Sequence, residues 1–191
     1  MKKLISTGRR KNMLLEENTA LVVIDVQGKL ADIVHESEKM LENIVTLIKG
    51  VQLLHIPIIW LEQYPEGLGQ TKQQIQTLLS EQDPIKKMDF SASDTDEFHE
   101  QLRKLNREQF LVVGMEAHVC VFQTVVDLLE SKESVDIVVD GISSRTAQNK
   151  AIAIDRMATM GANKTSVEMA LFELMKSANH PKFQEIRHLI K

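Results

Sequence analysis

The stretch that decides the fold covers residues 110–124 and has the sequence FLVVGMEAHVCVFQT. Its first four residues, 110–113, are apolar and mostly β-branched, which is typical of a buried strand, and Gly114 is expected to end that strand. From residue 119 onward apolar residues recur at helical spacing, namely Val121, Val125, Leu128 and Leu129. The stretch therefore predicts a strand followed by a helix, with Cys120 in the first helical turn.

Cys120 is the only cysteine of the 191 residues, and it admits two interpretations. The start of a helix carries unpaired N–H groups and a partial positive charge. This setting lowers the pKa of a thiol and favours the thiolate, which is the nucleophilic form. The alternative is that Cys120 is a small buried hydrophobic residue, as most free cysteines are. The spacing within the stretch leaves both open.

Two further strands are predicted upstream of this stretch. Residues 19–24 form an apolar run that ends at Asp25, and residues 58–61 form a second run. Between them, residues 37–55 have the apolar spacing of a helix, which Pro57 stops. A carboxylate at the end of a buried strand is costly unless it is paired or functional, so Asp25 is either a site residue or a turn residue.

Strands and helices alternate along the rest of the chain. Short strands are predicted within residues 84–92 and at 135–139, the latter ending at Asp140 and Gly141. Helices are predicted near residues 71–80, 97–105 and 150–160, after a capping box that starts at Thr165, and from Pro181 to Ile190. This alternation is typical of a single three-layer α/β domain over residues 1–191, with a mostly parallel sheet covered by helices on both faces.

Composition and charge exclude several classes of protein. The chain is 43% hydrophobic and 26% charged with a net charge of −4, and no basic stripe with interleaved aromatics indicates nucleic-acid binding. No apolar run is long enough to span a membrane, and a single cysteine fits a reducing, cytoplasmic location. Residues 1–17 form a basic arm without the apolar core of a secretory signal. We expect a flexible or surface-packed arm, with an organelle transit peptide as the alternative.

Three residues of complementary chemistry follow predicted strands. Asp25, Lys87 and Cys120 each lie at or just beyond a carboxyl end, and in a doubly wound sheet these ends converge on one crevice. A cysteine nucleophile needs a group that takes its proton and a charge that stabilises the thiolate. A carboxylate can do the first and an ammonium the second. Lys86 competes for the lysine role, but strand alternation places it on the opposite face from Lys87.

The sequence resembles the isochorismatase-like cysteine hydrolases. Three motifs occur in the family's order: LVVIDVQ with Asp25, KMDFSAS with Lys87 and GMEAHVCV with Cys120. The segments EQYPEGLG, VVDGISSR and HPKFQEIRHLIK are similar to the isochorismatase domain-containing group within that family. The resemblance implies a six-stranded parallel sheet and a catalytic triad of Asp25, Lys87 and Cys120.

The resemblance also implies a non-proline cis peptide at Met115–Glu116. Its expected use is to direct the N–H groups of Ala117 or Glu116 and of Cys120 at a developing oxyanion. Four further residues are candidates to border the pocket: Tyr64, Phe90, Ser91 and His118. For Phe90 we expect packing, and for His118 a role in shaping its loop.

Relatives of the nicotinamidase type carry an Asp-x-His metal motif after the second strand. This chain has Glu62-Gln63-Tyr64 there, so neither a metal nor another cofactor is expected. The presence of Cys120 favours acyl chemistry over vinyl-ether hydrolysis.

The sequence thus predicts a hydrolase of a small-molecule amide or related acyl substrate, acting through a covalent Cys120 thioester. A homo-oligomer, dimer or larger, is expected from the family, without nucleic-acid or membrane partners. The competing hypothesis is a domain that kept the fold but acts through protein partners with little turnover. The apolar helix after Cys120 suits either an oligomer interface or a buried element.

Overall fold

The computed structural model describes residues 13–190, and six parallel strands form one sheet within them. The strands are β1 (Thr19–Ile24), β2 (Ile58–Gln63), β3 (Ile85–Lys87), β4 (Gln109–Met115), β5 (Ser134–Ser143) and β6 (Asn163–Thr165). Their order across the sheet is β3-β2-β1-β4-β5-β6. The predicted α/β class with a six-stranded parallel sheet is therefore confirmed.

Strand β1 lies at the centre and pairs with β2 on one side and β4 on the other. The chain first adds β2 and β3 outward from β1, then returns to place β4, β5 and β6 on the other side. The order reverses between β1 and β4. In open α/β sheets, ligands bind at the carboxyl ends of the strands beside such a reversal.

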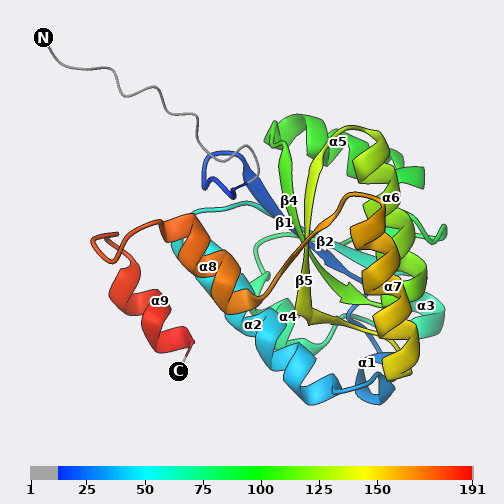
Figure 1. The fold of residues 1–191 in the computed structure, drawn as a ribbon. Helices are drawn as coiled ribbons and strands as arrows, with labels where there is room; N and C mark the ends of the chain where they lie inside the picture. Colours follow the sequence, from blue (N-terminus) through cyan, green and yellow to red (C-terminus); the bar gives the residue numbers. More distant parts are fainter. Residues whose placement is uncertain (1–12, 191) are drawn as a thin grey trace, which may run out of the picture.

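Helices cover both faces of the sheet (Figure 1). One face carries α2 (Ser37–Leu53), α4 (Gln73–Leu78), α8 (Val167–Met175) and α9 (Phe183–Leu189). The other carries α5 (Asp96–Leu105), α6 (Phe122–Glu130) and α7 (Ala147–Thr159). Short turns α1 (Leu30–Ile33), α3 (Pro65–Leu68), η1 (Ala92–Asp94) and η2 (Ala117–Val121) follow the carboxyl ends of β1 to β4.

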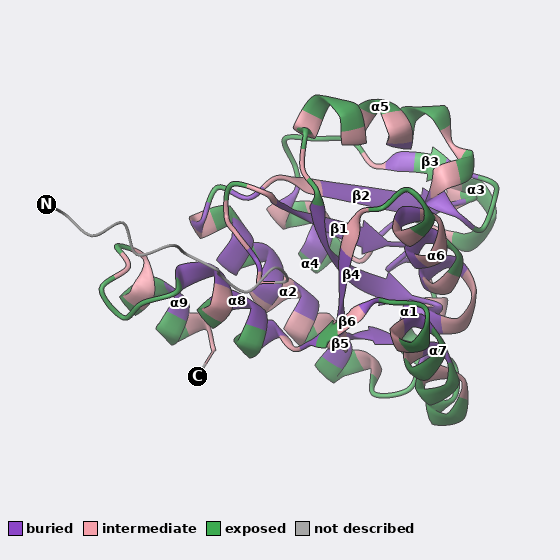
Figure 2. Ribbon diagram, turned by 45° about the horizontal axis from the view of Figure 1, so that its top comes forward, coloured by how far each residue is buried: buried purple, intermediate pink, exposed green. Residues whose placement is uncertain are grey.

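The sheet is the buried middle layer (Figure 2). Every residue of β1 is buried, and alternate side chains enter different cores. Leu21 and Val23 pack with α2 and α8, whereas Val22 and Ile24 pack with α5, α6 and α7. Because parallel strands are buried on both faces, the predicted strands appear in the sequence as continuous apolar runs.

The structure corrects two predicted strand ends. Gly114 does not end β4, and Asp140 with Gly141 does not end β5. After a register shift between Val112 and Gly114, the two strands stay paired, so that Gly114 lies opposite Ile142. Cross-strand pairing therefore overrides the local turn preference of glycine and aspartate.

The cap of α8 also differs from the prediction. Thr165 belongs to β6, where it pairs with Val138 of β5. Strand β6 is a short edge strand that the sequence did not indicate. Ser166 is the N-cap, and its hydroxyl accepts a hydrogen bond from the N–H of Met169 at 3.2 Å. The predicted capping box is thus wrong by one residue, because edge pairing claims Thr165.

Gly114 is required by its surroundings. Its φ is +130°, and a Cβ atom built there would lie 2.1 Å from the carbonyl oxygen of Ile24. Gly161 also has a positive φ of +115°, but a Cβ there would meet nothing within 4 Å. Gly114→Ala is expected to lower the free energy of unfolding by about 1–3 kcal/mol more than Gly161→Ala, since only the first adds overpacking to the strain. Denaturant titration measures both, and equal losses would contradict this account.

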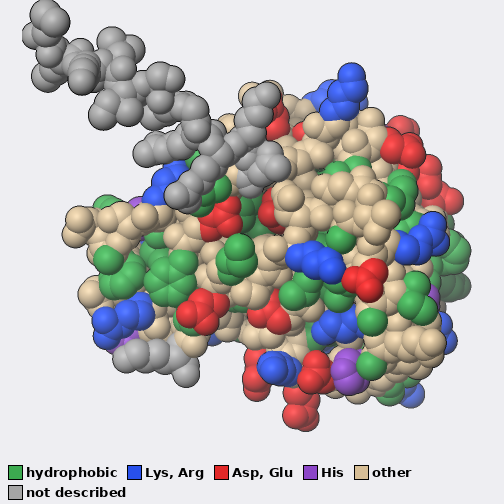
Figure 3. Space-filling view, viewed as in Figure 1, with side chains coloured by type: hydrophobic (Ala, Val, Ile, Leu, Met, Phe, Trp, Pro, Cys, Tyr) green, Lys and Arg blue, Asp and Glu red, His purple; other side chains and the backbone are tan. Residues whose placement is uncertain are grey.

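Residues 1–12 of the predicted basic arm lie outside the described residues. The last residues of the predicted arm are packed, since Leu14 is fully buried and its N–H donates to Glu173 Oε1 at 2.8 Å. On the face seen in Figure 3, cationic and anionic side chains are interspersed. No helix within residues 13–190 is both long enough and apolar enough to cross a membrane.

Candidate active site

The structure brings Asp25, Lys87 and Cys120 together where the strand order reverses. Asp25 follows β1, Lys87 ends β3, and Cys120 lies in the η2 turn after β4. All three are buried, with exposed fractions of 4%, 3% and 7%. The three residues, distant in the sequence, therefore lie together in the fold, as the strand pattern predicted.

The Lys87 ammonium is surrounded by oxygen atoms. It donates to Asp25 Oδ2 at 2.8 Å and to Gln63 Oε1 at 2.6 Å. It also lies 3.2 Å from the carbonyl oxygen of Asp89 and 3.1 Å from that of Phe90. An ammonium has three protons, so four acceptors leave no N–H group of Lys87 without a partner. Lys86, the competing candidate, is exposed.

Asp25 keeps one carboxylate oxygen unused. Its Oδ1 atom is buried and has no hydrogen-bond partner among the described residues. Burial raises the pKa of the Asp25 carboxyl, while the Lys87 ammonium and the Cys120 thiol act in the opposite direction. Because the Asp25 carboxyl also interacts with the Cys120 thiol, it is the candidate base that takes the thiol proton.

The prediction that the Cys120 thiol has a lowered pKa is wrong. Burial raises the pKa of this thiol to about 12, with a further contribution from the Asp25 charge that Lys87 only partly offsets. The expected benefit of a helix start is outweighed because the thiol is buried beside a carboxylate. Cys120 is thus a neutral thiol at rest, and it becomes a nucleophile only when a base takes its proton.

This acidity gives a direct test by alkylation. The rate with iodoacetamide should rise about tenfold per pH unit from pH 7 to 10.5 without a plateau, because only the thiolate reacts. Asp25→Asn should raise the rate at a given pH, because it removes a charge that raises the thiol pKa. The intact mass of the protein measures alkylation at Cys120, because the chain has a single cysteine. Alkylation of the unfolded protein is the control for a thiol without the folded surroundings. A plateau below pH 9 in the folded protein would contradict the raised pKa.

Gln63 is a site residue that the sequence analysis missed. It is the last residue of β2 and the register partner of Lys87, and its Oε1 atom lies 3.9 Å from Cys120 Sγ. Gln27 holds its backbone, accepting from the Gln63 N–H at 2.8 Å and donating to its carbonyl at 2.9 Å. The sequence analysis predicted that the second strand ends at residue 61, whereas β2 ends at Gln63. A predicted strand two residues longer would have placed Gln63 at the same edge of the sheet as Asp25.

The loop before Cys120 is tied to the loop after β5. The Met115–Glu116 peptide is cis. The buried Glu116 carboxylate accepts from Arg145 Nε at 3.1 Å and from the Arg145 N–H at 3.1 Å. His118 lies 3.5 Å from the same carboxylate and 2.9 Å from the Ser144 hydroxyl. These contacts agree with the expected role of His118 in shaping its loop.

The remaining pocket candidates are Tyr64, Phe90 and Ser91, of which the first two are exposed and the third is buried. The Tyr64 side chain is 46% exposed, and its N–H donates to the carbonyl of Lys87 at 2.9 Å. The packing predicted for Phe90 is wrong, because its side chain is 54% exposed while only its carbonyl faces Lys87. Ser91 is buried and bonded to Asp127, so it fixes the loop after β3 against α6.

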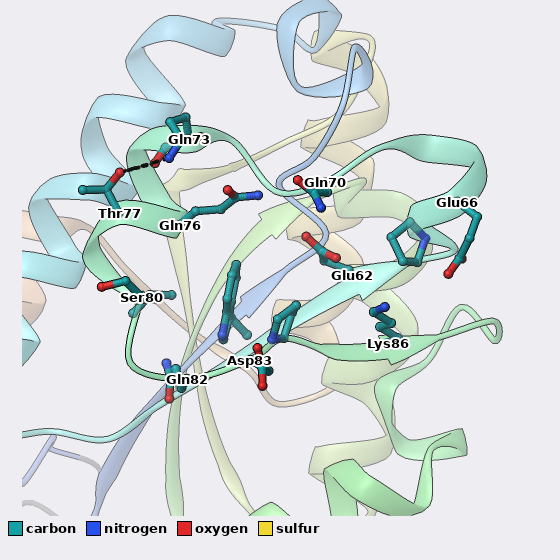
Figure 4. A pocket seen from close by; sticks show the side chains of 14 residues that line it. Glu62, Glu66, Gln70, Gln73, Gln76, Thr77, Ser80, Gln82, Asp83 and Lys86 are labelled. Atoms are coloured by element: carbon teal, nitrogen blue, oxygen red, sulfur yellow. Dashed lines mark hydrogen bonds between the residues drawn. The ribbon is translucent and has the colours of Figure 1, made fainter.

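A separate polar cavity of about 760 Å³ lies on the opposite face of the sheet (Figure 4). Glu62 and Lys86 line it, and their side chains alternate with Gln63 and Lys87 along β2 and β3. It does not contain the Cys120 thiol. Within residues 13–190, no cluster of three histidine, cysteine, aspartate or glutamate side chains could hold a metal ion.

Comparisons with known proteins agree with this geometry. The isochorismatase domain model matches residues 19–169. The secreted isochorismatase effector Isc1 of Phytophthora sojae is 34% identical, over 100% of this chain and 93% of that protein. Isochorismatase domain-containing protein 2B of Mus musculus is 31% identical, over 93% and 83%. The solved structure of the MAR1 ribonuclease from Caenorhabditis elegans is 37% identical, over 93% and 92% of the two chains, with a TM-score of 0.88.

The matched region contains the sheet and the residues that meet at its switch point, from Asp25 to Cys120. The fold and these similarities together support a hydrolase role. The chain belongs to the isochorismatase family.

Proposed function

We propose that the protein hydrolyses a small amide or related acyl compound through a covalent thioester on Cys120. The observation that carries this proposal is the buried Asp25 carboxyl, which interacts with the Cys120 thiol, pairs with the Lys87 ammonium through Oδ2 and keeps Oδ1 without a partner. A neutral thiol with an adjacent base is the arrangement that nucleophilic acyl transfer requires.

The reaction then has two halves. Asp25 takes the thiol proton as sulfur attacks the carbonyl carbon, and Lys87 stabilises the resulting charges. The C–N bond breaks, the amine leaves with the proton from Asp25, and a C–S bond holds the acyl group. Water, deprotonated by Asp25, attacks the thioester; the C–S bond breaks, and the thiol recovers its proton as the acid leaves.

The η2 turn supplies candidates for the oxyanion site. The N–H groups of Val119 and Val121 both donate to the carbonyl of Glu116. We assign the oxyanion role to the N–H groups of Ala117 and Cys120, because the first N–H groups of a helix lack intrahelical acceptors. One donor of this kind typically contributes roughly 3 kcal/mol to the transition state.

The experiment is to trap the acyl-enzyme while screening small amides, with esters, vinyl ethers and short RNA as other substrate classes. Wild-type protein quenched during turnover should gain the mass of the acyl group on the peptide that contains Cys120. The Cys120→Ala variant should gain none. The proposal would be contradicted if wild-type protein turned over substrate without an adduct at any quench time and Cys120→Ala kept full activity.

RNA is included because the relative from Caenorhabditis elegans is named a ribonuclease. A phosphodiester substrate calls for cationic side chains that are free to pair with phosphate. The Lys87 ammonium is already bonded to four oxygen atoms, and the chain has a net charge of −4. These charges favour a small acyl substrate.

We also propose that the chain forms a homo-oligomer. Large apolar side chains stay exposed on both sides of the molecule. Met169 and Phe172 are exposed on α8, and Ile152 and Met160 are exposed on or next to α7, which covers the opposite face of the sheet. Exposed apolar surface on a helix often marks an interface. Light scattering after size-exclusion chromatography measures the mass directly, and a mass of one chain at micromolar concentration would contradict this proposal.

A further inference from the structure

Two loops at the carboxyl end of the sheet expose apolar side chains. Tyr64 follows β2, and Met88 and Phe90 follow β3, with exposed fractions of 46%, 67% and 54%. Tyr64 and Met88 are the next residues after the register pair Gln63 and Lys87, and the Tyr64 N–H donates to the Lys87 carbonyl at 2.9 Å. We call Tyr64, Met88 and Phe90 the apolar rim.

The apolar rim begins directly beside the candidate active site. The carbonyl of Phe90 lies 3.1 Å from the Lys87 ammonium, which in turn interacts with the Cys120 thiol. The carbonyl of Met88 accepts a hydrogen bond from the Gln63 amide at 2.6 Å. The backbone of each rim residue after β3 is therefore bonded to a residue of the site.

The loop after β3 also runs on the same face of the sheet as the thiol. Its residue Ala92 is fully buried in the core that contains Cys120. The Ala92 N–H donates to Thr124 Oγ1 at 3.0 Å, and Thr124 lies on α6, the helix directly after the turn that carries Cys120. This loop thus connects the lysine side of the site with the cysteine side.

The apolar side chains of the rim are not needed for these contacts. Met88 and Phe90 act through their carbonyls and Tyr64 through its N–H, which are groups that every residue except proline has. The Tyr64 ring nevertheless has a defined place, because a Cβ atom on Gly67 would lie 2.2 Å from its Cε1 atom. Single exposed apolar residues are common, but three beside one polar site indicate a surface for a ligand.

The charges on the same two loops are negative. Glu66 is the only ionisable residue among residues 65–69, Asp89 is the only one among residues 88–91, and both are exposed. A carboxylate on the substrate would be repelled by these charges. The two loops therefore favour a neutral, apolar group.

We propose that the apolar rim determines specificity by contacting the apolar acyl group of a neutral amide whose carbonyl carbon is attacked by Cys120. Amides with a hydrocarbon or aromatic acyl group are then favoured over the shortest amides and over those that carry a carboxylate. This inference rests on the proposed function for its reaction. The affinity of the rim for apolar groups rests on the geometry alone.

The first test measures the rim without turnover, by alkylating Cys120 with N-phenyliodoacetamide and with iodoacetamide. The ratio of the two rates is divided by the same ratio for glutathione, so that the thiolate fraction and the intrinsic reactivity cancel. Wild-type protein should prefer the phenyl reagent about fivefold or more, because contact with the rim removes apolar surface from water. Met88→Gln/Phe90→Gln should lose most of this preference. Tyr64→Asn should lose part of it, and asparagine tolerates the φ of 37° at this position.

The matched control is Met169→Gln/Phe172→Gln, which replaces an exposed methionine and phenylalanine on α8. Helix α8 packs on the face of the sheet opposite the core of Cys120, so this variant should keep the wild-type preference whether or not its oligomeric mass changes. Light scattering is also measured for Met88→Gln/Phe90→Gln. A smaller mass than wild type in that variant would identify the rim as an interface between copies of the chain and refute the proposal.

The second test measures turnover, from the ammonia released by primary amides. The value of kcat/KM should rise about two- to fourfold per methylene from acetamide to hexanamide. Isocaproamide should be preferred over succinamate, in which a carboxylate replaces the isopropyl group. Both trends should weaken in Met88→Gln/Phe90→Gln.

A phenyl preference equal to that of glutathione, or one unchanged in Met88→Gln/Phe90→Gln, would overturn the proposal. If no amide is hydrolysed but the alkylation preference behaves as expected, the proposed function fails while the selectivity of the rim for apolar groups stands. If amides are hydrolysed through Cys120 without a preference for longer acyl groups, the proposed function stands and the role of the rim is refuted.

Discussion

Cys120→Ala is expected to lower the turnover of any amide that the protein hydrolyses by at least about 10⁴-fold. Removing a nucleophile from a covalent mechanism leaves only binding and oxyanion stabilisation, and losses on the order of 10⁴ to 10⁶ are measured in such cases. The side chain is 7% exposed and alanine is smaller, so the fold should persist. Initial rates at saturating substrate measure the effect.

The control for Cys120→Ala is Asp155→Asn. Asp155 lies on α7 in an exposed pair with Lys164 at 3.0 Å, remote in the chain from every candidate site residue. The Asp155→Asn substitution should leave turnover unchanged, because exposed ion pairs contribute little to the stability of the fold. Retention of more than about a tenth of wild-type turnover in Cys120→Ala would exclude the thioester route.

Lys87→Met is expected to destabilise the fold as well as the site. The Lys87 ammonium is fully buried, and its loss leaves the Asp25 carboxylate buried without a counter-charge. Breaking one partner of a buried ion pair typically costs about 3–5 kcal/mol, whereas removing both charges costs much less. The free energy of unfolding, from urea titration near pH 7.5, should fall accordingly in Lys87→Met and recover in the double variant Asp25→Asn/Lys87→Met.

The loss in Lys87→Met should depend on pH with a definite sign. The pKa of Asp25 is already raised in the folded protein, and removal of Lys87 raises it further. A raised carboxyl pKa means that folding favours the protonated form, so stability falls as pH rises from the unfolded value of about 3.9 through the folded pKa. The variant should therefore lose least below about pH 4. A loss that is constant from pH 3 to 8, or no recovery in the double variant, would contradict the pairing of Lys87 with Asp25.

The site could be predicted only as far as local patterns reach. Asp25, Lys87 and Cys120 each lie at or just beyond the end of a predicted strand, and parallel topology alone places such positions at one edge. Gln63 could not be found in this way, because the end of β2 is set by its pairing with β3, which no local pattern encodes. The ends of β4 and β5 were misjudged for the same reason, since their continued pairing carries both strands past Gly114 and Gly141.

The amino-acid sequence by itself determined the class of the fold, the family and the three residues that meet at the switch point. These depend on apolar runs, alternation and motif order, which are properties of neighbouring residues. The tertiary structure alone decided the state of the thiol. Its acidity depends on burial and on the distances to Asp25 and Lys87, and these are set by elements that lie far apart in the chain. A helix start favours a thiolate locally, but desolvation and a neighbouring carboxylate outweigh it once the chain is folded.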